Sequence, residues 1–599
     1  MNFPRRSPFS VPLCVLCISV VNFFSCSSEK PREKVDLIVH NAVVYTVDSL
    51  FSVAESFAIK DGKIIAVGKS DSILAQYDGE KLDAQGKAVY PGFIDSHCHF
   101  LGYGLGLNQA DLVGTKSFDE VLKKVVEFAE VNKSEWIIGR GWDQNDWDVK
   151  EFPDRKKLDS LFPNTPVFLK RIDGHAVLVN GEALRRAKIT NRTKVTGGTI
   201  EYVFTNDDSW TVEEDRKEIK RMSYPYFDPT GILIDNAIDL VASVIPPPTP
   251  AQMENALLKA QKNCFEVGLT TVDDAGLMKH EIDAIDSLQK QGKLKMRVYA
   301  MLSDSAPNYA HYLVKNVYKT ERLNVRSFKL YADGALGSRG ACLMEDYHDK
   351  KGWSGFLLNK LAHFEKRALQ LYEQGFQMNV HCIGDSAHRA MLNVYRNTVL
   401  FPRKKLNGSD TIISLRTHDP GPKYWRWRIE HAQVIHPSDL DIYKTCGIIP
   451  SVQPTHATSD MYWAEERLGK ERMKGAYAYR SLLKAAGMVA LGTDFPVEQI
   501  NPMTTFYAAV FRKDAKGFPE GGFMSEEALT REETLKGMTI WGAFANFEEK
   551  EKGSIEPGKF ADFVILDNDI MKCEESKILS TKVLYTFLNG EKVYGSGSL

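Results

Sequence analysis

The chain has 599 residues, too many for one small domain and enough for a large barrel with an insertion. Hydrophobic residues make up 43% and charged residues 26%, which is the composition of a soluble globular protein. The formal net charge of -2 provides no basic excess, so we expect neither nucleic acid nor a bulk membrane surface as a partner.

The first 26 residues have the pattern of an export signal. Arg5 and Arg6 precede an apolar run, residues 11–24, that is too short for a confident transmembrane helix. Cys26 follows a serine, as in bacterial lipoprotein signals, although two phenylalanines depart from the usual residues before it. We expect export in a bacterium with a lipid anchor on Cys26 and a linker over residues 27–35. Cleavage to a soluble periplasmic or secreted protein and an uncleaved anchor are the alternatives.

Both ends of the remaining chain contain short strands separated by glycine turns. Residues 37–48 alternate as a strand, and residues 58–68 form two strands around Asp61-Gly62, which is a hairpin signal. Residues 553–569 and 583–595 have the same character. The similarity of the two ends predicts one composite β-sandwich, built from residues 36–90 and 546–599.

Residues 91–545 alternate short apolar strands with longer amphipathic stretches such as 250–268. This alternation predicts a parallel sheet with crossover helices, and eight such units predict a TIM (β/α)8 barrel in the α/β class. The gap after the first strand indicates an insertion at about 101–248. The eight expected strands are 92–100, 268–276, 296–302, 327–335, 377–385, 427–434, 447–454 and 488–497.

Polar side chains gather where these strands end. His97 and His99 close the first strand, and residues i and i+2 of a strand point to one face, as a metal site requires. In a TIM barrel the strand ends meet at one mouth, where function lies. Four later strands contribute to the same predicted site, through Lys329, His381, His431 and Asp494.

Lys329 does not fit a metal site in its cationic form, because an ammonium has no lone pair and is costly to desolvate. It could be neutralised by deprotonation or by reaction with CO2 to a carbamate, which has carboxylate-like oxygens. Alternatively, Lys329 reaches solvent from the strand and takes no part in the site.

Five segments, in this order, closely resemble the amidohydrolase superfamily and its YtcJ-like branch, amidohydrolase family 3, which includes N-substituted formamide deformylases. They are PGFIDSHCHF, KLYADGALGSRG, NVHCIGD, RIEHAQ and LGTDFPVE, and the resemblance extends from about Asp36 to the C-terminus. It implies a metal-dependent TIM barrel with a composite β-sandwich. It also implies that one or two ions, usually zinc, are surrounded by His97, His99, His381, His431 and Asp494. Lys329 occupies the position of a carbamylated bridging lysine in many members.

A mechanism follows from these ligands. A metal-activated water would attack the carbonyl carbon of an amide-like small molecule while the metal polarises the carbonyl oxygen. Asp494 is the predicted catalytic residue, which takes the proton from the water and passes it to the leaving nitrogen. A purely metal-binding carboxylate is the alternative. Cys98 and Cys382, beside metal-site histidines, are expected to be packing residues.

The insertion and two strand-end loops supply candidate substrate contacts. Each of them could instead form an ordinary salt bridge or a packing contact within a lid. Arg339 could bind a substrate carboxylate or carbonyl, and His456 could donate to the oxyanion. The substrate-binding candidates are Trp142, Asp143, His175, Arg339 and His456, with Trp147 and Asp173 in the same two insertion motifs.

The expected function is therefore hydrolysis of a non-peptide C–N bond in an amide, formamide or cyclic amide. Two alternatives remain: an isomerase or decarboxylase on the same scaffold, because a fold does not fix a reaction, and a lipid-anchored binding protein with a residual metal site. The partner is a small-molecule substrate, and a homodimer is left open.

Overall fold

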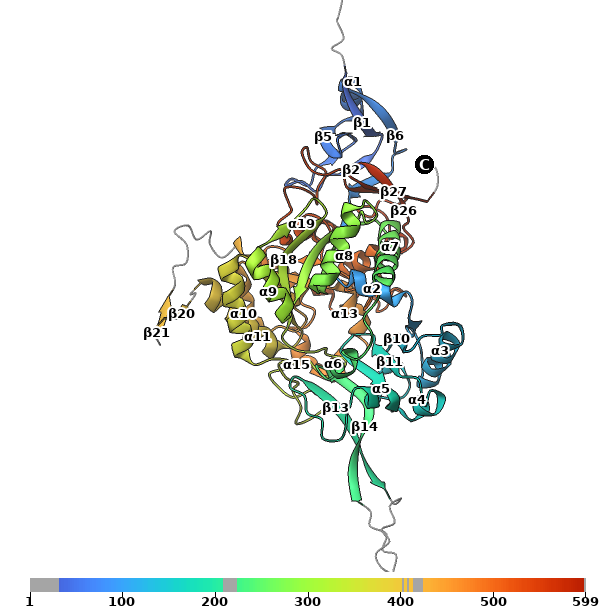
Figure 1. The fold of residues 1–599 in the computed structure, drawn as a ribbon. Helices are drawn as coiled ribbons and strands as arrows, with labels where there is room; N and C mark the ends of the chain where they lie inside the picture. Colours follow the sequence, from blue (N-terminus) through green and yellow to red (C-terminus); the bar gives the residue numbers. More distant parts are fainter. Residues whose placement is uncertain (1–31, 208–223, 401–402, 407–408, 413–423, 597–599) are drawn as a thin grey trace, which may run out of the picture.

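The computed structural model describes residues 32–207, 224–400, 403–406, 409–412 and 424–596 (Figure 1). The predicted export signal and Cys26 lie outside these residues. Among the described residues, no helix combines the length and the apolar character needed to cross a membrane. A parallel barrel sheet lies at the centre, in the strand order β24-β23-β22-β19-β18-β16-β15-β8.

The eight barrel strands confirm the predicted TIM barrel, since each overlaps its expected range. They are β8 (Phe93–Cys98), β15 (Leu269–Leu277), β16 (Arg297–Ser303), β18 (Leu323–Tyr331), β19 (Gln377–Cys382), β22 (Arg428–His431), β23 (Ile449–Val452) and β24 (Ala490–Leu491). A short strand, β17 (Tyr318–Lys319), pairs antiparallel with the first half of β18. The strands are almost wholly buried, as expected for a parallel sheet that is covered by helices.

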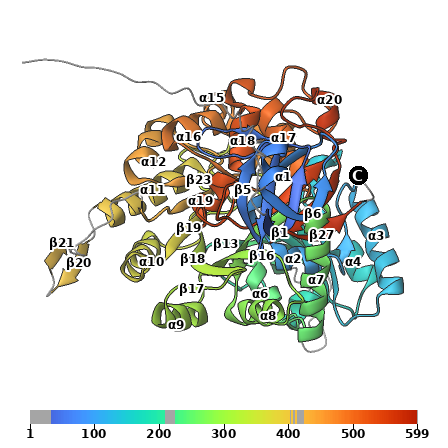
Figure 2. The ribbon, with the colours of Figure 1, turned by 90° about the horizontal axis from the view of Figure 1, so that it is seen from above.

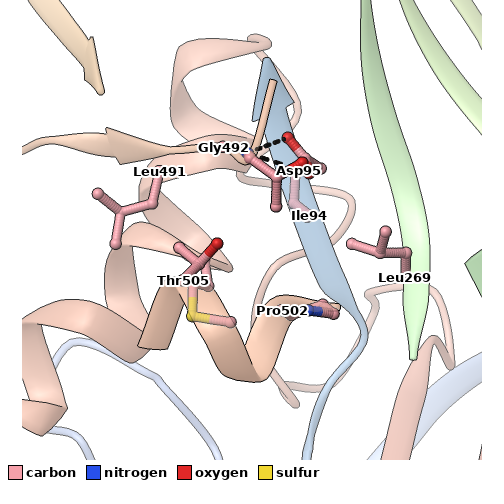
Figure 3. Close-up of a pocket in the computed structure, with 9 residues that line it drawn as sticks. Ile94, Asp95, Leu269, Leu491, Gly492, Pro502 and Thr505 are labelled. Atoms are coloured by element: carbon pink, nitrogen blue, oxygen red, sulfur yellow. Dashed lines mark hydrogen bonds between the residues drawn. The ribbon is translucent and has the colours of Figure 1, made fainter. Parts of the chain in front are cut away.

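The last and first strands meet through the backbone that follows them. Asp494 N donates to His97 O at 2.7 Å, and His99 N donates to Phe495 O at 2.8 Å. The Asp95 carboxylate accepts from Thr493 N at 3.0 Å and from Thr493 Oγ1 at 2.6 Å. Figure 3 shows Asp95 beside Gly492. A Cβ on Gly492 would lie 2.5 Å from His97 N, so only glycine allows this approach. These contacts between the ends of β8 and β24 thus hold His97 and Asp494 side by side.

The outer helices surround the barrel (Figure 2). The best defined start is that of α7 (Pro250–Glu266), where Thr249 and Gln252 form a capping box with proline in the first turn. Its buried face includes Leu257 and Cys264. The others are α8 (Lys279–Lys290), α9 (Ala306–Lys315), α10 (Leu361–Gln374), α11 (Asp385–Leu400), α12 (Leu440–Cys446), α13 (Pro454–Asp460), α14 (Ala464–Leu468), α15 (Lys470–Met473), α16 (Tyr479–Ala486), α17 (Pro502–Phe511), α18 (Arg531–Gly537) and α19 (Ile540–Ala545).

Two sheets form the predicted sandwich at one end of the molecule (Figure 1). One contains β5 (Lys63–Gly68), β4 (Ser56–Lys60), β1 (Glu33–His40) and β6 (Tyr77–Asp83), with α1 (Ser70–Gln76) against it. The other contains β27 (Glu591–Gly595), β26 (Val583–Leu588), β25 (Phe563–Leu566), β7 (Ala88–Pro91), β2 (Val43–Tyr45) and β3 (Val53–Ala54). The β4–β5 turn has φ of 50° at Asp61 and 73° at Gly62, which explains the aspartate–glycine pair.

The insertion forms a separate mixed sheet at the opposite end of the barrel (Figure 1). Its strands, in sheet order, are β13 (Gly198–Asp207), β14 (Tyr224–Asp235), β12 (Ala176–Val179), β11 (Val167–Arg171), β10 (Ile137–Trp142) and β9 (Ala110–Asp111). Helices α2 (Phe100–Gly106), α3 (Phe118–Val131), α4 (Lys156–Leu161), α5 (Gly181–Arg186) and α6 (Ile238–Ala242) belong to the same stretch. The sequence pattern predicted an insertion but no sheet within it.

Candidate active site

The carboxyl ends of the barrel strands bring the predicted metal ligands together. His97 lies on β8, His381 on β19 and His431 at the end of β22, and all three are buried. Asp494 follows β24 and is 5% exposed. His99 lies just beyond β8, at the start of α2, rather than within the strand as expected.

Distances between side chains define a compact cluster around Asp494. Its Oδ1 lies 3.2 Å from His99 Nε2 and 3.7 Å from His97 Nε2. The His431 ring centroid lies 4.9 Å from that of His97 and 4.4 Å from that of His381. One ligand atom from each of His97, His431 and Asp494 falls within 4.8 Å of the others. This spacing suits donors that share one ion.

The backbone is unusual at two of these residues. Asp494 has φ of 59° and His431 has φ of 68°, both in the left-handed region. Such conformations are uncommon for residues other than glycine, and they persist where the surrounding structure holds them. Here the hydrogen bond from Asp494 N to His97 O does so for Asp494. This conformation occurs at the last residue of β22 for His431 and beyond β24 for Asp494.

Charge states in the cluster favour metal binding. Burial lowers the pKa of His97 and lowers those of His381 and His431 well below their usual range, so these imidazoles are neutral and keep a lone pair. Burial alone would raise the pKa of Asp494, but His99, whose Nε2 lies 3.2 Å from Oδ1, holds that pKa well below its usual range. Neutral imidazoles with an ionised carboxylate are the donors that zinc and similar divalent ions prefer. Asp494 Oδ1 is also buried without a well-aligned hydrogen bond, so the residues fit a metal.

Lys329 does not reach solvent, contrary to the alternative considered for it. It lies on β18 and is 1% exposed, with its Nζ 3.0 Å from His97 Nε2. The Nζ also lies 4.8 Å from the centre of the Tyr331 ring. Burial lowers the pKa of Lys329 to about 8, so a substantial fraction of the amine is neutral in mildly alkaline solution.

Two residues that the sequence analysis missed hold the ligand rings. Glu430 Oε2 lies 2.5 Å from His97 Nδ1, and Gln453 Oε1 lies 2.8 Å from His431 Nδ1. With each Nδ1 engaged in this way, the Nε2 atom is left for the cluster. Glu430 stands directly before His431 in RIEHAQ, so a search for acids beside the predicted ligands would have found it.

Two predicted substrate residues lie beside this cluster. The His175 ring centroid is 4.8 Å from that of His381, and its Nδ1 lies 2.7 Å from Asp235 Oδ1. The His456 ring stacks on that of His431 at 5.9 Å and 14°. His456 Nε2 lies 3.9 Å from Asp494 Oδ2 and is buried without a hydrogen-bond partner among the described residues. His175 comes from the insertion, which therefore contributes to the site.

Three other predicted contacts have protein partners instead. Trp142 is 1% exposed, donates from Nε1 to Leu169 O at 2.8 Å and packs in the hydrophobic core of the insertion. Asp143 pairs with the buried Arg171. Arg339 Nη2 lies 2.9 Å from Asp349 Oδ2. These contacts correspond to the packing and salt-bridge roles that were considered as alternatives to substrate binding. Of the neighbouring candidates, Trp147 packs beside Trp142, while Asp173 pairs with Arg171 at 2.6 Å.

Comparisons with known proteins place the sequence in context. A sequence profile described as the amidohydrolase family matches residues 80–594. The Arabidopsis thaliana protein LONG AFTER FAR-RED 3 is 32% identical over 93% of this chain and 91% of its own length. YtcJ of Bacillus subtilis, which carries an amidohydrolase name, is 29% identical over 93% and 99%. The N-substituted formamide deformylase of Arthrobacter pascens is 25% identical over 93% and 97%.

A solved structure has a similar fold over most of the chain. It is a metal-dependent hydrolase of uncharacterized function from Pyrococcus horikoshii, with a TM-score of 0.68 and 27% sequence identity. The match covers 90% of this chain and 99% of that protein, so the barrel, sandwich and insertion are compared together.

Proposed function

The chain belongs to the amidohydrolase family, and from this membership we propose that it hydrolyses a non-peptide C–N bond in a small amide, formamide or cyclic amide. The observation that carries the proposal is the buried cluster in which His97, His431 and Asp494 place ligand atoms within 4.8 Å of one another. The name of the formamide deformylase relative supports the amide-type substrate.

Zinc, or another divalent metal, is the proposed cofactor, with one or two ions per chain. The residues that would hold it are His97, His99, His381, His431 and Asp494. When bound, such an ion lowers the pKa of a water molecule to near neutral pH, and the ion also polarises a carbonyl group. Asp494 has the ionised carboxylate needed to accept that proton and return it to the leaving nitrogen. His456, whose Nε2 lacks a partner, would donate to the carbonyl oxygen.

Lys329 is proposed to carry a carbamate. Its neutral amine would form an Nζ–C bond with CO2 and release one proton. The resulting carbamate would present carboxylate-like oxygens beside His97. The buried position and the pKa of about 8 support this assignment. Mass spectrometry of the intact protein, prepared with and without bicarbonate, would detect the added mass, and Lys329→Met should remove it.

The test of the main proposal combines metal analysis with an activity screen. Purified protein should contain bound zinc, iron or manganese, and it should release amine from members of an amide, formamide and cyclic-imide panel. A chelator should abolish release, and the metal should restore it. Metal-loaded protein that isomerises or decarboxylates these compounds without releasing amine would support the non-hydrolytic alternative. Protein that retains no metal would favour the binding-protein alternative.

We also propose that the protein is exported and anchored by a lipid on Cys26. The apolar run over residues 11–24 and the Ser-Cys pair support this. In a bacterial host, Cys26→Ser should move the protein from the membrane fraction to the soluble fraction, or leave it with an uncleaved signal. An unchanged distribution with a cleaved N-terminus would favour soluble export.

A further inference from the structure

Two cationic side chains lie next to each other on the insertion sheet. Arg140 on β10 and Lys170 on β11 are directly paired in the parallel register, so their side chains share one face. Neither forms an ion pair with a carboxylate of the described residues, although many other cations of the chain do. Neighbouring charges of the same sign repel, and this pair has no anion in contact.

The pair lies close to the active site. An Nη2 hydrogen of Arg140 is donated to Ile172 O at 2.8 Å. Ile172 belongs to the loop that leads to His175, whose ring is 4.8 Å from that of His381. The charge of Asp494 also acts on Arg140. The guanidinium is therefore held against the same loop that brings the insertion to the metal ligands.

Arg140 and Lys170 are both half-buried. Burial lowers the pKa of Arg140, and burial together with the charge of Arg140 lowers that of Lys170 to about 8. Arg140 Nε is buried without an acceptor among the described residues. The charges of Asp494 and Asp173 act on Arg140, and that of Asp239 acts on Lys170, but none of these acids lies at ion-pair distance from the two cations. Asp173 already pairs with Arg171 at 2.6 Å. Partly desolvated charges are costly unless they are paired, so two such cations without a carboxylate of the described residues at ion-pair distance are suited to bind an anion from outside the chain.

We propose that Arg140 and Lys170 form an anion subsite that binds an acidic group of the substrate while the scissile amide lies at the metal cluster. The inference rests on the proposed function and narrows it to N-acyl or N-formyl compounds that carry an acid, with a carboxylate as the first candidate. The guanidinium can donate two parallel hydrogen bonds to a carboxylate, and the ammonium supplies a second charge. A phosphate would satisfy the same donors.

The substrate test uses matched compounds. N-formylphenylalanine carries a carboxylate, and N-formyl-2-phenylethylamine has the same skeleton without it. The metal-loaded enzyme should show a kcat/KM about tenfold or more higher for the acid, because hydrogen bonds to charged groups are worth roughly that factor or more. N-formyl-1-amino-2-phenylethylphosphonate tests a phosphorus acid in the same place. A preference for the phosphonate over the carboxylate would assign the subsite to phosphate-like groups.

Variants separate the subsite from the catalytic machinery. Arg140→Gln and Lys170→Met should lower kcat/KM for the acid about tenfold, mainly through KM, and change the neutral compound less than about twofold. Arg140→Lys should recover part of the preference. Matched controls from the same insertion are Arg192→Gln and Lys194→Met, since both side chains are exposed and form no described ion pair. These controls should leave the preference unchanged.

A binding measurement gives a readout that does not need turnover. 3-Phenylpropionate should bind the metal-loaded protein more tightly than 3-phenylpropionamide by calorimetry, and Arg140→Gln should remove the difference. A difference that survives in Arg140→Gln would assign carboxylate binding to the metal and overturn the subsite. Equal turnover of the acid and neutral formamides would also overturn it while leaving the hydrolase proposal intact. Failure of every formamide, with normal Arg140-dependent binding, would instead contradict the hydrolase proposal alone.

Discussion

At the scale of single residues, two of the candidate ligand histidines are held in place by a second side chain. His97 is fixed by Glu430 at 2.5 Å and His431 by Gln453 at 2.8 Å. Such outer partners set the tautomer and the direction of a metal-binding imidazole. The rigidity of the site therefore depends on residues that never touch an ion.

Glu430→Gln tests this dependence. The amide keeps the size of the side chain but removes its charge, so we expect metal affinity to fall about 10- to 100-fold. Competition with a chromogenic chelator would measure the change. Glu365→Gln, at an exposed position on α10, is the control and should have wild-type affinity. An unaltered affinity in Glu430→Gln would show that Glu430 does not support His97.

Asp494→Asn tests the catalytic assignment. The substitution removes the ionised carboxylate, so we expect turnover to fall by about 10²-fold or more, in the range of lost general acid–base catalysis. The circular dichroism spectrum should stay that of the wild type. Activity near the wild-type level, measured with saturating metal, would refute the proton-transfer role.

The sequence predicted the residues that converge but not all of their surroundings. His97, His381 and His431 were predictable because polar groups at the ends of parallel strands meet at one mouth. Trp142 was not, because a tryptophan in a lid and one in the core of that lid have the same local pattern. Its burial against Trp147 depends on the sheet of the insertion. The partner of Arg339, Asp349, lies on a loop whose course no periodicity reveals.

At the scale of elements, the sandwich is joined to the barrel by a buried ion pair. Arg297 begins β16, and its Nε lies 2.6 Å from Asp562 Oδ2, just before β25. The guanidinium also donates to Glu321 O at 2.9 Å and lies 4.0 Å from the centre of the Phe560 ring. Both charges are almost fully buried, so each depends on the other.

Asp562→Ala should therefore destabilise the protein strongly. It leaves Arg297 buried without its anion, at a cost of about 3–5 kcal/mol in the free energy of unfolding. Urea denaturation of the metal-free protein would measure it. Glu591→Ala breaks the nearby exposed pair with Lys295 and should cost at most about 1 kcal/mol. Equal costs for the two variants would show that burial of the Arg297 pair contributes nothing.

Hydrophobic patterning in the sequence predicted the strands of the barrel but not those of the insertion. Short apolar runs marked all eight barrel strands, because strands buried on both faces are largely hydrophobic. In the insertion, β10 carries two glycines and Arg140, and β14 contains two prolines. These residues lower strand propensity, and pairing with distant segments, such as β9 with β10, compensates for it.

At the scale of the whole molecule, metal binding should couple to stability. The ligands come from β8, β19, β22 and the end of β24, which span the barrel, so an ion would bind only when the barrel is closed. Free metal at about 100 times its dissociation constant would add about 2.7 kcal/mol to stability. We expect a higher melting temperature for zinc-loaded than for chelator-treated protein, measured by scanning fluorimetry.

The control for this coupling is Asp494→Asn, whose melting temperature should respond less to zinc. An equal response in the variant would place the stabilising ion elsewhere. If zinc raised the melting temperature of neither protein, the cluster would not bind it in the folded state.

One sandwich sheet joins three strands from each end of the chain, and the two groups meet where β7, which lies beside β2, pairs with β25. Protein synthesis is vectorial, so a nascent chain exposes one edge of β7 until the ribosome has finished the entire barrel and its last strands emerge. A prematurely terminated chain would keep this edge of β7 without a strand partner. Chaperones and proteases could therefore distinguish a truncated chain from the full-length one by the β7 edge, which only β25 covers.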